Sequence, residues 1–221
     1  REKYSQRQIS KMLLVSQATI SNIISHYVAR HPDKVEKIVF SSPGTFLPHK
    51  QINGRYVSVD SVYPAPDSLT FIEPYDFVKD VDNMAMKPKA MLASMGALLL
   101  NKKLISDEQM DRMLNTLASQ FTKGMVCDPA NVLPEEGGGG LYAYIATNSG
   151  DYPEVRDKLQ SVQVPALVLQ GQCEYHSYGA GYEYVDVFPN ARYQQIEGAG
   201  HEIWWEQRAA YVEAIRTFLS E

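Results

Sequence analysis

The sequence predicts an α/β protein with a parallel sheet flanked by helices. Three short segments are predicted to be strands: 38–40 and the apolar run 166–169, followed by a short strand at 192–196 that ends in a Gly-Ala-Gly turn. Apolar residues recur at helical spacing over 20–28, and an amphipathic helix is expected at 206–219. A helix that connects two strands through short links makes a parallel crossover, so these strands are expected to lie parallel.

Local breakers set the ends of the first elements. The first helix is expected to end near Arg30 and His31, because Pro32 cannot continue a helix and restricts the residue before it. The strand at 38–40 stops at a Ser-Ser-Pro-Gly turn. The strand at 166–169 begins after Pro165 and is stopped by Gly171.

A mostly helical insertion is expected between the two halves of the sheet. Helices are predicted at 89–102, at 141–147 and from Ser106, where Ser106 and Gln109 have the spacing of a capping box. A connection this long is typical of a lid over a site. The predicted domains are a core at 1–44, a helical cap at 45–155 and a second core segment at 156–221.

Composition excludes several classes of protein. The 221 residues are 44% hydrophobic and carry a net charge of −5, so no global basic field attracts nucleic acid or anionic membrane. No apolar run approaches the roughly 20 residues of a membrane span. The two cysteines, Cys127 and Cys173, are too few for a disulfide framework and too far apart for a metal knuckle. The sequence therefore predicts reduced thiols and a cytoplasmic protein.

An acidic residue and a histidine follow two successive strands. The strand at 166–169 leads to Glu174, and the strand at 192–196 leads through a Gly-Ala-Gly turn to His201. Parallel strands deliver their carboxyl ends to one edge of a sheet, so the two side chains are expected to converge there. A histidine base oriented by a carboxylate is two thirds of a nucleophile, base and acid relay.

Four segments resemble the alpha/beta-hydrolase family, especially its proline iminopeptidases and small-molecule ester hydrolases: "ARHPDKVEKIVFSSPG", "VPALVLQGQCEY", "FPNARY" and "EGAGHEIWWEQ". The resemblance covers the chain from about His26 to its end and implies that His201 and Glu174 are the base and the acid, although the family mostly has Asp at the acid position. It also implies further strands before this chain begins. We expect an upstream segment, a second chain or an exchanged dimer to supply them.

The same resemblance places the nucleophile at Ala18, in a position that normally carries Ser within G-x-S-x-G. Ser16 and Ile20 stand where the glycines belong. An engineered change would explain Ala18 alone, whereas a naturally degenerate elbow would explain all three positions. A displaced nucleophile at Ser16 or Ser21 is a further hypothesis.

The resemblance implies a small ester, amide or related carbonyl compound as substrate, with no metal and no organic cofactor. The amide of Thr19, the residue after the nucleophile position, would contribute to the oxyanion hole. Tyr175, Tyr178 and Trp204 would contact the substrate. Without a serine, a non-hydrolytic cyclase, a lyase or a pseudoenzyme could use the same pocket.

A DNA-binding regulator is the alternative from another class. Residues 5–24 resemble a helix-turn-helix whose second helix begins at Gln17 and would present Thr19, Ser21 and Asn22 to the bases. That helix has no Lys or Arg between Gln17 and Val28, which leaves few groups to neutralise phosphates. The charge pattern therefore favours a small-molecule partner over nucleic acid.

Overall fold

The computed structural model describes residues 17–74, 122–132 and 152–221, with shorter pieces at 92–93, 96, 99–100, 102–106 and 108–109. The predicted helix at 141–147, most of the one at 89–102 and the first helix of the helix-turn-helix hypothesis lie outside these residues. The capping box is confirmed at the two residues that define it. The Ser106 amide donates to Gln109 Oε1 at 3.0 Å, and the Gln109 amide donates to Ser106 Oγ at 3.2 Å.

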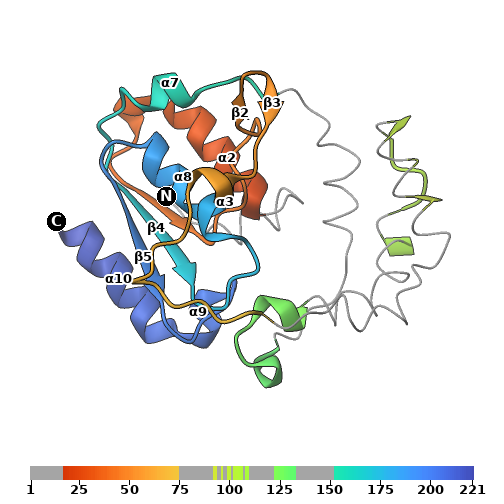
Figure 1. Ribbon diagram of the computed structural model, residues 1–221, viewed down its shortest axis with the longest axis vertical. Helices are drawn as coiled ribbons and strands as arrows, with labels where there is room; N and C mark the ends of the chain where they lie inside the picture. The colour runs from red at the N-terminus through yellow and green to blue at the C-terminus, as the bar shows by residue number, and fades with distance from the viewer. Residues whose placement is uncertain are drawn as a thin grey trace.

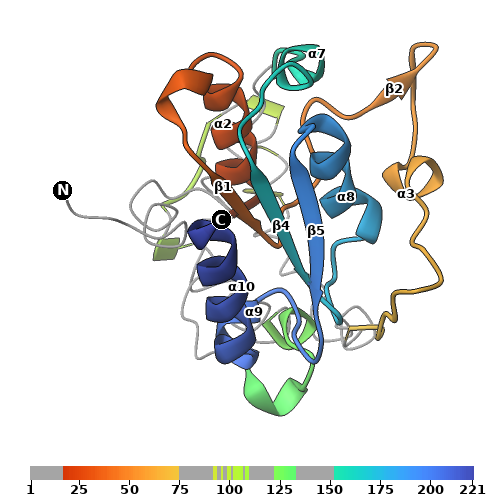
Figure 2. The same ribbon diagram turned by 90° about the vertical axis from the view of Figure 1, so that its left-hand side faces the viewer.

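A parallel sheet forms the centre of the described part of the chain (Figure 2). Its strands are β1 (Ile38–Ser41), β4 (Ala166–Gly171) and β5 (Ala191–Ile196), in the order β1-β4-β5. Phe40 pairs with Val168, which pairs in turn with Tyr193. Every residue of β4 is buried, as expected of an apolar strand between two neighbours and two helical layers. The predicted fold class is confirmed.

Helices cover both faces of the sheet (Figures 1 and 2). Alternate residues of a strand point to opposite faces, so β4 contributes to two separate clusters. Ala166 and Val168 pack with residues of α2 (Gln17–Val28) and α8 (Tyr178–Val187). Leu167 and Leu169 pack with Ala214 and Phe218 of α10 (Arg208–Ser220). The result is a three-layer arrangement in which the sheet is the middle layer.

The amphipathic helix predicted at 206–219 is confirmed as α10. A four-residue helix that was not predicted, α9 (Ile203–Glu206), precedes it. Gln207 separates them with φ −125° and ψ 53°, and its side-chain amide donates to the Gly198 carbonyl at 3.2 Å. The Gln207 side chain thus joins the position between α9 and α10 to the turn that follows β5.

Short elements lie between and around these helices and strands. A hairpin joins β2 (Gln51–Ile52) to β3 (Arg55–Tyr56), and Asp60 of α3 (Val59–Val62) accepts a hydrogen bond of 3.1 Å from the Gly179 amide of α8. The remaining elements are η1 (Pro32–Lys34), η3 (Thr122–Met125), η4 (Pro129–Asn131) and α7 (Arg156–Leu159). Within the predicted cap at 45–155, the described helices and strands are the β2–β3 hairpin, α3, η3 and η4.

A buried ion pair links α7 to α8. Arg156 Nε and Nη2 donate to Glu183 Oε1 at 3.0 and 2.9 Å, and the Glu183 side chain has no exposed surface. Arg156 Nη2 also donates to the Pro48 carbonyl at 2.7 Å, and its guanidinium lies over the Phe46 ring. Burial raises the pKa of Glu183, and the Arg156 guanidinium opposes that shift. This pair fixes the start of the second core segment against α8.

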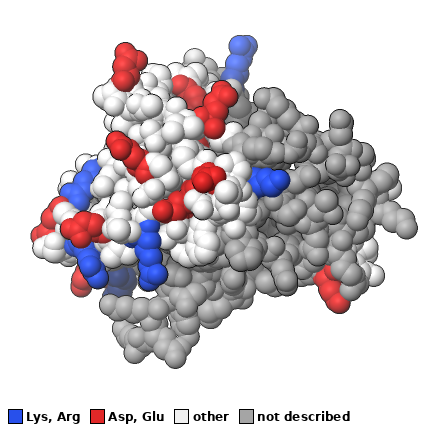
Figure 3. Space-filling view, turned by 90° about the horizontal axis from the view of Figure 1, so that it is seen from below, with Lys and Arg blue, Asp and Glu red and all other residues white. Residues whose placement is uncertain are grey.

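The surface carries charges of both signs. Figure 3 shows basic and acidic side chains interspersed over one face of the described residues. None of the helices in the described part of the chain has the length and apolarity needed to cross a bilayer.

Candidate active site

The loops that follow β4 and β5 lie against each other. The Gln172 amide donates to the Ile196 carbonyl at 3.0 Å, and the Cys173 amide donates to the Ala199 carbonyl at 2.9 Å. A Cβ at Gly171 would collide with the carbonyl oxygens of Ala199 and Gly200. Glycine at the end of β4 therefore allows the two loops to approach closely, and the loops carry Glu174 and His201 to the same place.

Glu174 and His201 form a buried hydrogen-bonded pair. The distance between His201 Nδ1 and Glu174 Oε1 is 2.8 Å, and the two residues are 5% and 8% exposed respectively. The same carboxylate oxygen accepts the His176 amide at 3.1 Å, which fixes the carboxylate. On the other side, Ser42 Oγ donates to the His201 carbonyl at 2.9 Å. Groups from the ends of all three strands thus hold the Glu174–His201 pair.

The electrostatics of the pair fix which atom carries the proton. Burial alone would raise the pKa of Glu174, but His201 and the hydrogen bonds from His201 and His176 outweigh it and hold this pKa below its ordinary value. An ionised carboxylate can only accept hydrogen bonds, so Nδ1 of His201 is the protonated nitrogen of the neutral ring. Nε2 then carries the lone pair of a base.

Two aromatic side chains line this pair. The Tyr175 ring lies 4.7 Å from the His201 ring, and the His176 ring lies 5.4 Å from it. Burial lowers the pKa of His176 to about 4, so its imidazole is neutral at physiological pH. Burial also raises the pKa of Tyr175, which keeps its phenol protonated. Glu174, His176 and His201 each offer a ligand atom, and these atoms lie within 4.8 Å of one another.

The other predicted site residues, Tyr178 and Trp204, make contacts with neighbouring side chains. Tyr178 stacks on Tyr182 and packs edge-on against Tyr193, with ring centroids 5.1 Å apart in both cases. Trp204 is half-buried in α9, and its indole N–H donates to Glu202. Trp205 is exposed and donates to the Asn131 carbonyl at 2.8 Å. Substrate contact by Tyr175, Tyr178 and Trp204 stays a prediction.

The predicted nucleophile position falls in the first turn of α2. Ala18 and Thr19 follow Gln17, the first residue of that helix, and the expected strand and turn before it lie outside the described residues. Their roles as nucleophile position and oxyanion amide stay predictions. Ser21, a candidate displaced nucleophile, is fully buried.

Asn22, which the DNA-binding hypothesis presents to bases, is turned into the protein. Its side chain is 1% exposed, donates to the Thr45 carbonyl at 3.1 Å and accepts the Leu47 amide at 2.6 Å. These contacts hold the side-chain amide inside the chain, where it cannot reach a base edge. The local environment of α2 therefore favours a packed helix of the α/β core.

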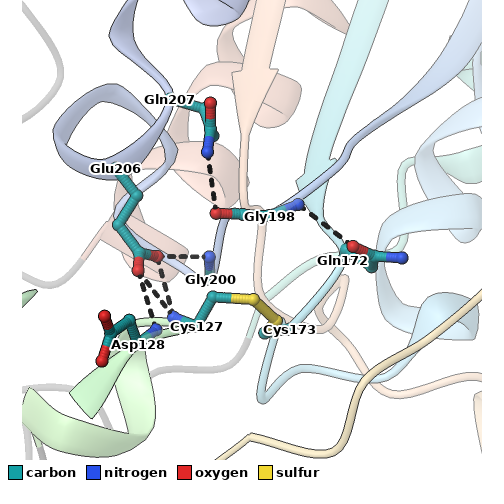
Figure 4. Close-up of a disulfide and its surroundings, with 8 residues drawn as sticks. All are labelled: Cys127, Asp128, Gln172, Cys173, Gly198, Gly200, Glu206 and Gln207. Atoms are coloured by element: carbon teal, nitrogen blue, oxygen red, sulfur yellow. Dashed lines mark hydrogen bonds between the residues drawn. A yellow bond between two sulfur atoms is a disulfide. The ribbon is translucent and has the colours of Figure 1, made fainter. Parts of the chain in front are cut away.

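The expectation of reduced thiols is wrong. Cys127 and Cys173 form a disulfide, with their Cα atoms 5.1 Å apart (Figure 4). The two residues are 46 positions apart in sequence, and only the fold brings them together. The bond attaches the segment 122–132 to the loop that carries Glu174.

A carboxylate of α9, the short helix that follows His201, reinforces this attachment. Glu206 accepts hydrogen bonds from the amides of Cys127, Asp128 and Gly200 at 2.7 to 3.0 Å (Figure 4). Nearby, the Gly198 amide donates to Gln172 Oε1 at 3.0 Å. Backbone amides gathered around a carboxylate make charge-assisted hydrogen bonds, which are stronger than neutral ones. The segment 122–132 therefore belongs to the scaffold of the site.

Sequence reasoning missed three residues that shape the site. His176 belongs to no motif of the sequence, and its contacts with Glu174 and His201 arise only in the fold. Ser42 was only part of a turn, and its φ of 44° and its hydrogen bond to His201 are consequences of tertiary structure. Gln170 is fully buried in β4 and donates to the carbonyls of His176 and Ser177 at 3.0 and 3.1 Å. A polar residue inside an apolar strand was the available indication for Gln170.

No family model and no curated protein matches the chain. An alpha/beta fold family hydrolase from Bacillus anthracis is similar to the chain with a TM-score of 0.48 and 17% identity, over 86% of this chain and 61% of that one. An enol-lactonase from Burkholderia xenovorans is similar with a TM-score of 0.42 and 19% identity, over 89% of this chain and 61% of that one. Naproxen esterase from Bacillus subtilis is similar with a TM-score of 0.41 and 18% identity, over 89% of this chain and 55% of that one. The chain spans less than two thirds of each. Because the TM-scores lie below 0.5, the functional interpretation rests on the chain's own residues. Those residues define an α/β protein with a buried Glu–His pair at the carboxyl edge of its parallel strands.

Proposed function

We propose that the Glu174–His201 pair is a general base that acts on a small ester, amide or related carbonyl compound. The observation that carries this proposal is the 2.8 Å hydrogen bond between the two buried side chains, placed where parallel strands end. Sites in open α/β sheets lie at that edge. The substrate class comes from the sequence resemblance to ester hydrolases.

The geometry supports a specific division of roles. Glu174 accepts the Nδ1 proton and so leaves Nε2 of His201 unprotonated. When Nε2 takes a proton from water or from a substrate, the ring becomes positive, and the adjacent carboxylate stabilises that charge. The hydrogen bonds to Glu174 from His176 and to the His201 carbonyl from Ser42 keep the ring oriented.

Alanine at position 18 excludes a covalent intermediate through that side chain. The chemistry left to the pair is direct activation of water or abstraction of a substrate proton. The first outcome is hydrolysis without an acyl-enzyme, and the second is the proton transfer that an elimination or a cyclisation needs. Both use His201 in the same role.

Replacing His201 with alanine tests the proposal. Turnover of a panel of p-nitrophenyl esters is expected to fall by about 10² to 10⁴, the usual contribution of a general base. Circular dichroism should show that the variant is folded. His31→Ala is the matched control, because His31 is exposed after α2 and should leave turnover unchanged. Equal turnover of wild type and His201→Ala would refute the assignment of the base.

A further inference from the structure

We propose that Glu174, His176 and His201 also bind a divalent transition-metal ion, with Zn²⁺ as the best fit, and that the bound ion inhibits the site. The ligand atoms of these three residues lie within 4.8 Å of one another. Zn²⁺ sits about 2 Å from each N or O ligand, so its ligands lie within about 4 Å of one another. The side chains need to move by less than about 1 Å to close around the ion.

A second observation points to a ligand at the same place. The Glu174 side chain is only 1% exposed, and its Oε2 has no hydrogen-bond partner among the described residues. A buried, ionised oxygen without a partner is costly. A cation bound to this carboxylate would remove that cost.

The donor set selects the kind of ion. Two imidazoles and one carboxylate suit Zn²⁺ and its first-row neighbours, whereas Ca²⁺ and Mg²⁺ prefer ligand sets made of oxygen. Three protein ligands would leave one position of a tetrahedral ion for water.

The backbone around the three ligands is already held in place. Gln170 donates to the carbonyl of His176, and Ser42 donates to the carbonyl of His201. These contacts hold the backbone of both histidines in position before any ion binds. His176 and Glu174 belong to one loop and His201 to the other, so the ion would bridge the two loops where they already touch.

Binding and general-base chemistry exclude each other. The ion would take the place of the proton that His201 Nδ1 donates to Glu174 Oε1, and that proton would pass to solvent. With His201 and Glu174 engaged as ligands, the ring is no longer an oriented base. The inhibition rests on the proposed function, whereas the binding does not.

Isothermal titration with ZnCl₂ and the visible absorption of the Co²⁺ complex test the binding directly. Reductant is omitted so that Cys127 and Cys173 stay in their disulfide and cannot act as thiolate ligands. We expect one ion per chain, and we expect His176→Ala to weaken binding about a hundredfold or more, since it removes a ligand rather than a supporting contact. His31→Ala should bind as the wild type does. His176→Gln, which keeps a polar side chain, replaces His176→Ala if the latter fails to fold.

Absence of zinc binding by the wild type would overturn the proposal, as would undiminished binding by both His176 variants. Ester turnover provides the separate arm for inhibition. Zinc should lower ester turnover by the wild type and should not lower ester turnover by His176→Ala at the same concentration. If neither protein turns over esters, the proposed function fails while the titration still decides whether the metal site exists.

Discussion

Replacing Arg156 with alanine is expected to lower the free energy of unfolding by about 3–5 kcal/mol, the cost of leaving one charge of a buried pair without its partner. The carboxylate left behind, Glu183, is fully buried, and its Oε2 already lacks a partner among the described residues. The change also removes the hydrogen bond to Pro48 and the contact with Phe46. Urea unfolding followed by circular dichroism measures the effect.

Lys158→Ala is the matched control for this experiment. Lys158 lies on the same helix, α7, and its side chain is exposed, so its replacement should change stability by no more than about 0.5 kcal/mol. Combining Arg156→Met with Glu183→Leu should recover part of the loss, because an apolar pair leaves no uncompensated charge. A loss for Arg156→Ala no greater than that for Lys158→Ala would show that the pair is not buried as described.

Breaking the disulfide is expected to destabilise the protein by about 3–4 kcal/mol. The bond closes a loop between residues 46 positions apart, and the entropy that such a loop removes from the unfolded chain gives a value of this size. Either dithiothreitol or Cys127→Ser should therefore shift the urea midpoint downward. The reductant should have no further effect on Cys127→Ser, which distinguishes loss of this bond from a general effect of the reagent.

Thiol titration of the unfolded protein provides the decisive check on the disulfide. Two reactive thiols in protein that was never reduced would contradict the bond, as would an unfolding midpoint insensitive to reductant. Cys173 of the disulfide is the residue before Glu174. Glu206 accepts hydrogen bonds from the amides of Cys127 and Gly200, and so links the disulfide to the loop that carries His201. We therefore expect reduction to lower ester turnover as well as stability.

The sheet was predictable because its evidence is local in the sequence. Each strand is a short segment bounded by Gly or Pro, and a single helix connecting strands implies parallel order. The approach of Glu174 and His201 followed from the same reasoning, since both residues come directly after parallel strands. Local pattern and topology were sufficient for this part.

Turn chemistry and packing explain most of what was missed. The hairpin turn at Asn53 and Gly54 has φ of 52° and 74°, and an Asn-Gly pair is a strong local indication of such a hairpin. Helix α8 is rich in glycine, which disfavours helix formation in isolation. Its glycines permit close contact instead, since a Cβ at Gly179 would meet the backbone of Val59 and one at Gly181 would meet Gln170.

The remaining misses depend on residues that are distant in the sequence. The partners of the disulfide are 46 residues apart, and Arg156 and Glu183 are 27 apart. Charged or thiol side chains separated this far carry no periodic pattern that identifies their partners. Only the packing of α7 on α8, and of the segment 122–132 on the site, brings these pairs together.

The tautomer of His201 is the most direct test of the proposed pair. Long-range ¹H–¹⁵N NMR at neutral pH distinguishes a protonated ring nitrogen from an unprotonated one, and the His201→Ala variant assigns the resonances. We predict a protonated Nδ1 and an unprotonated Nε2 in the wild type, with this preference lost in Glu174→Gln. A ring protonated at Nε2, or one unaffected by Glu174→Gln, would contradict the Glu174–His201 pair.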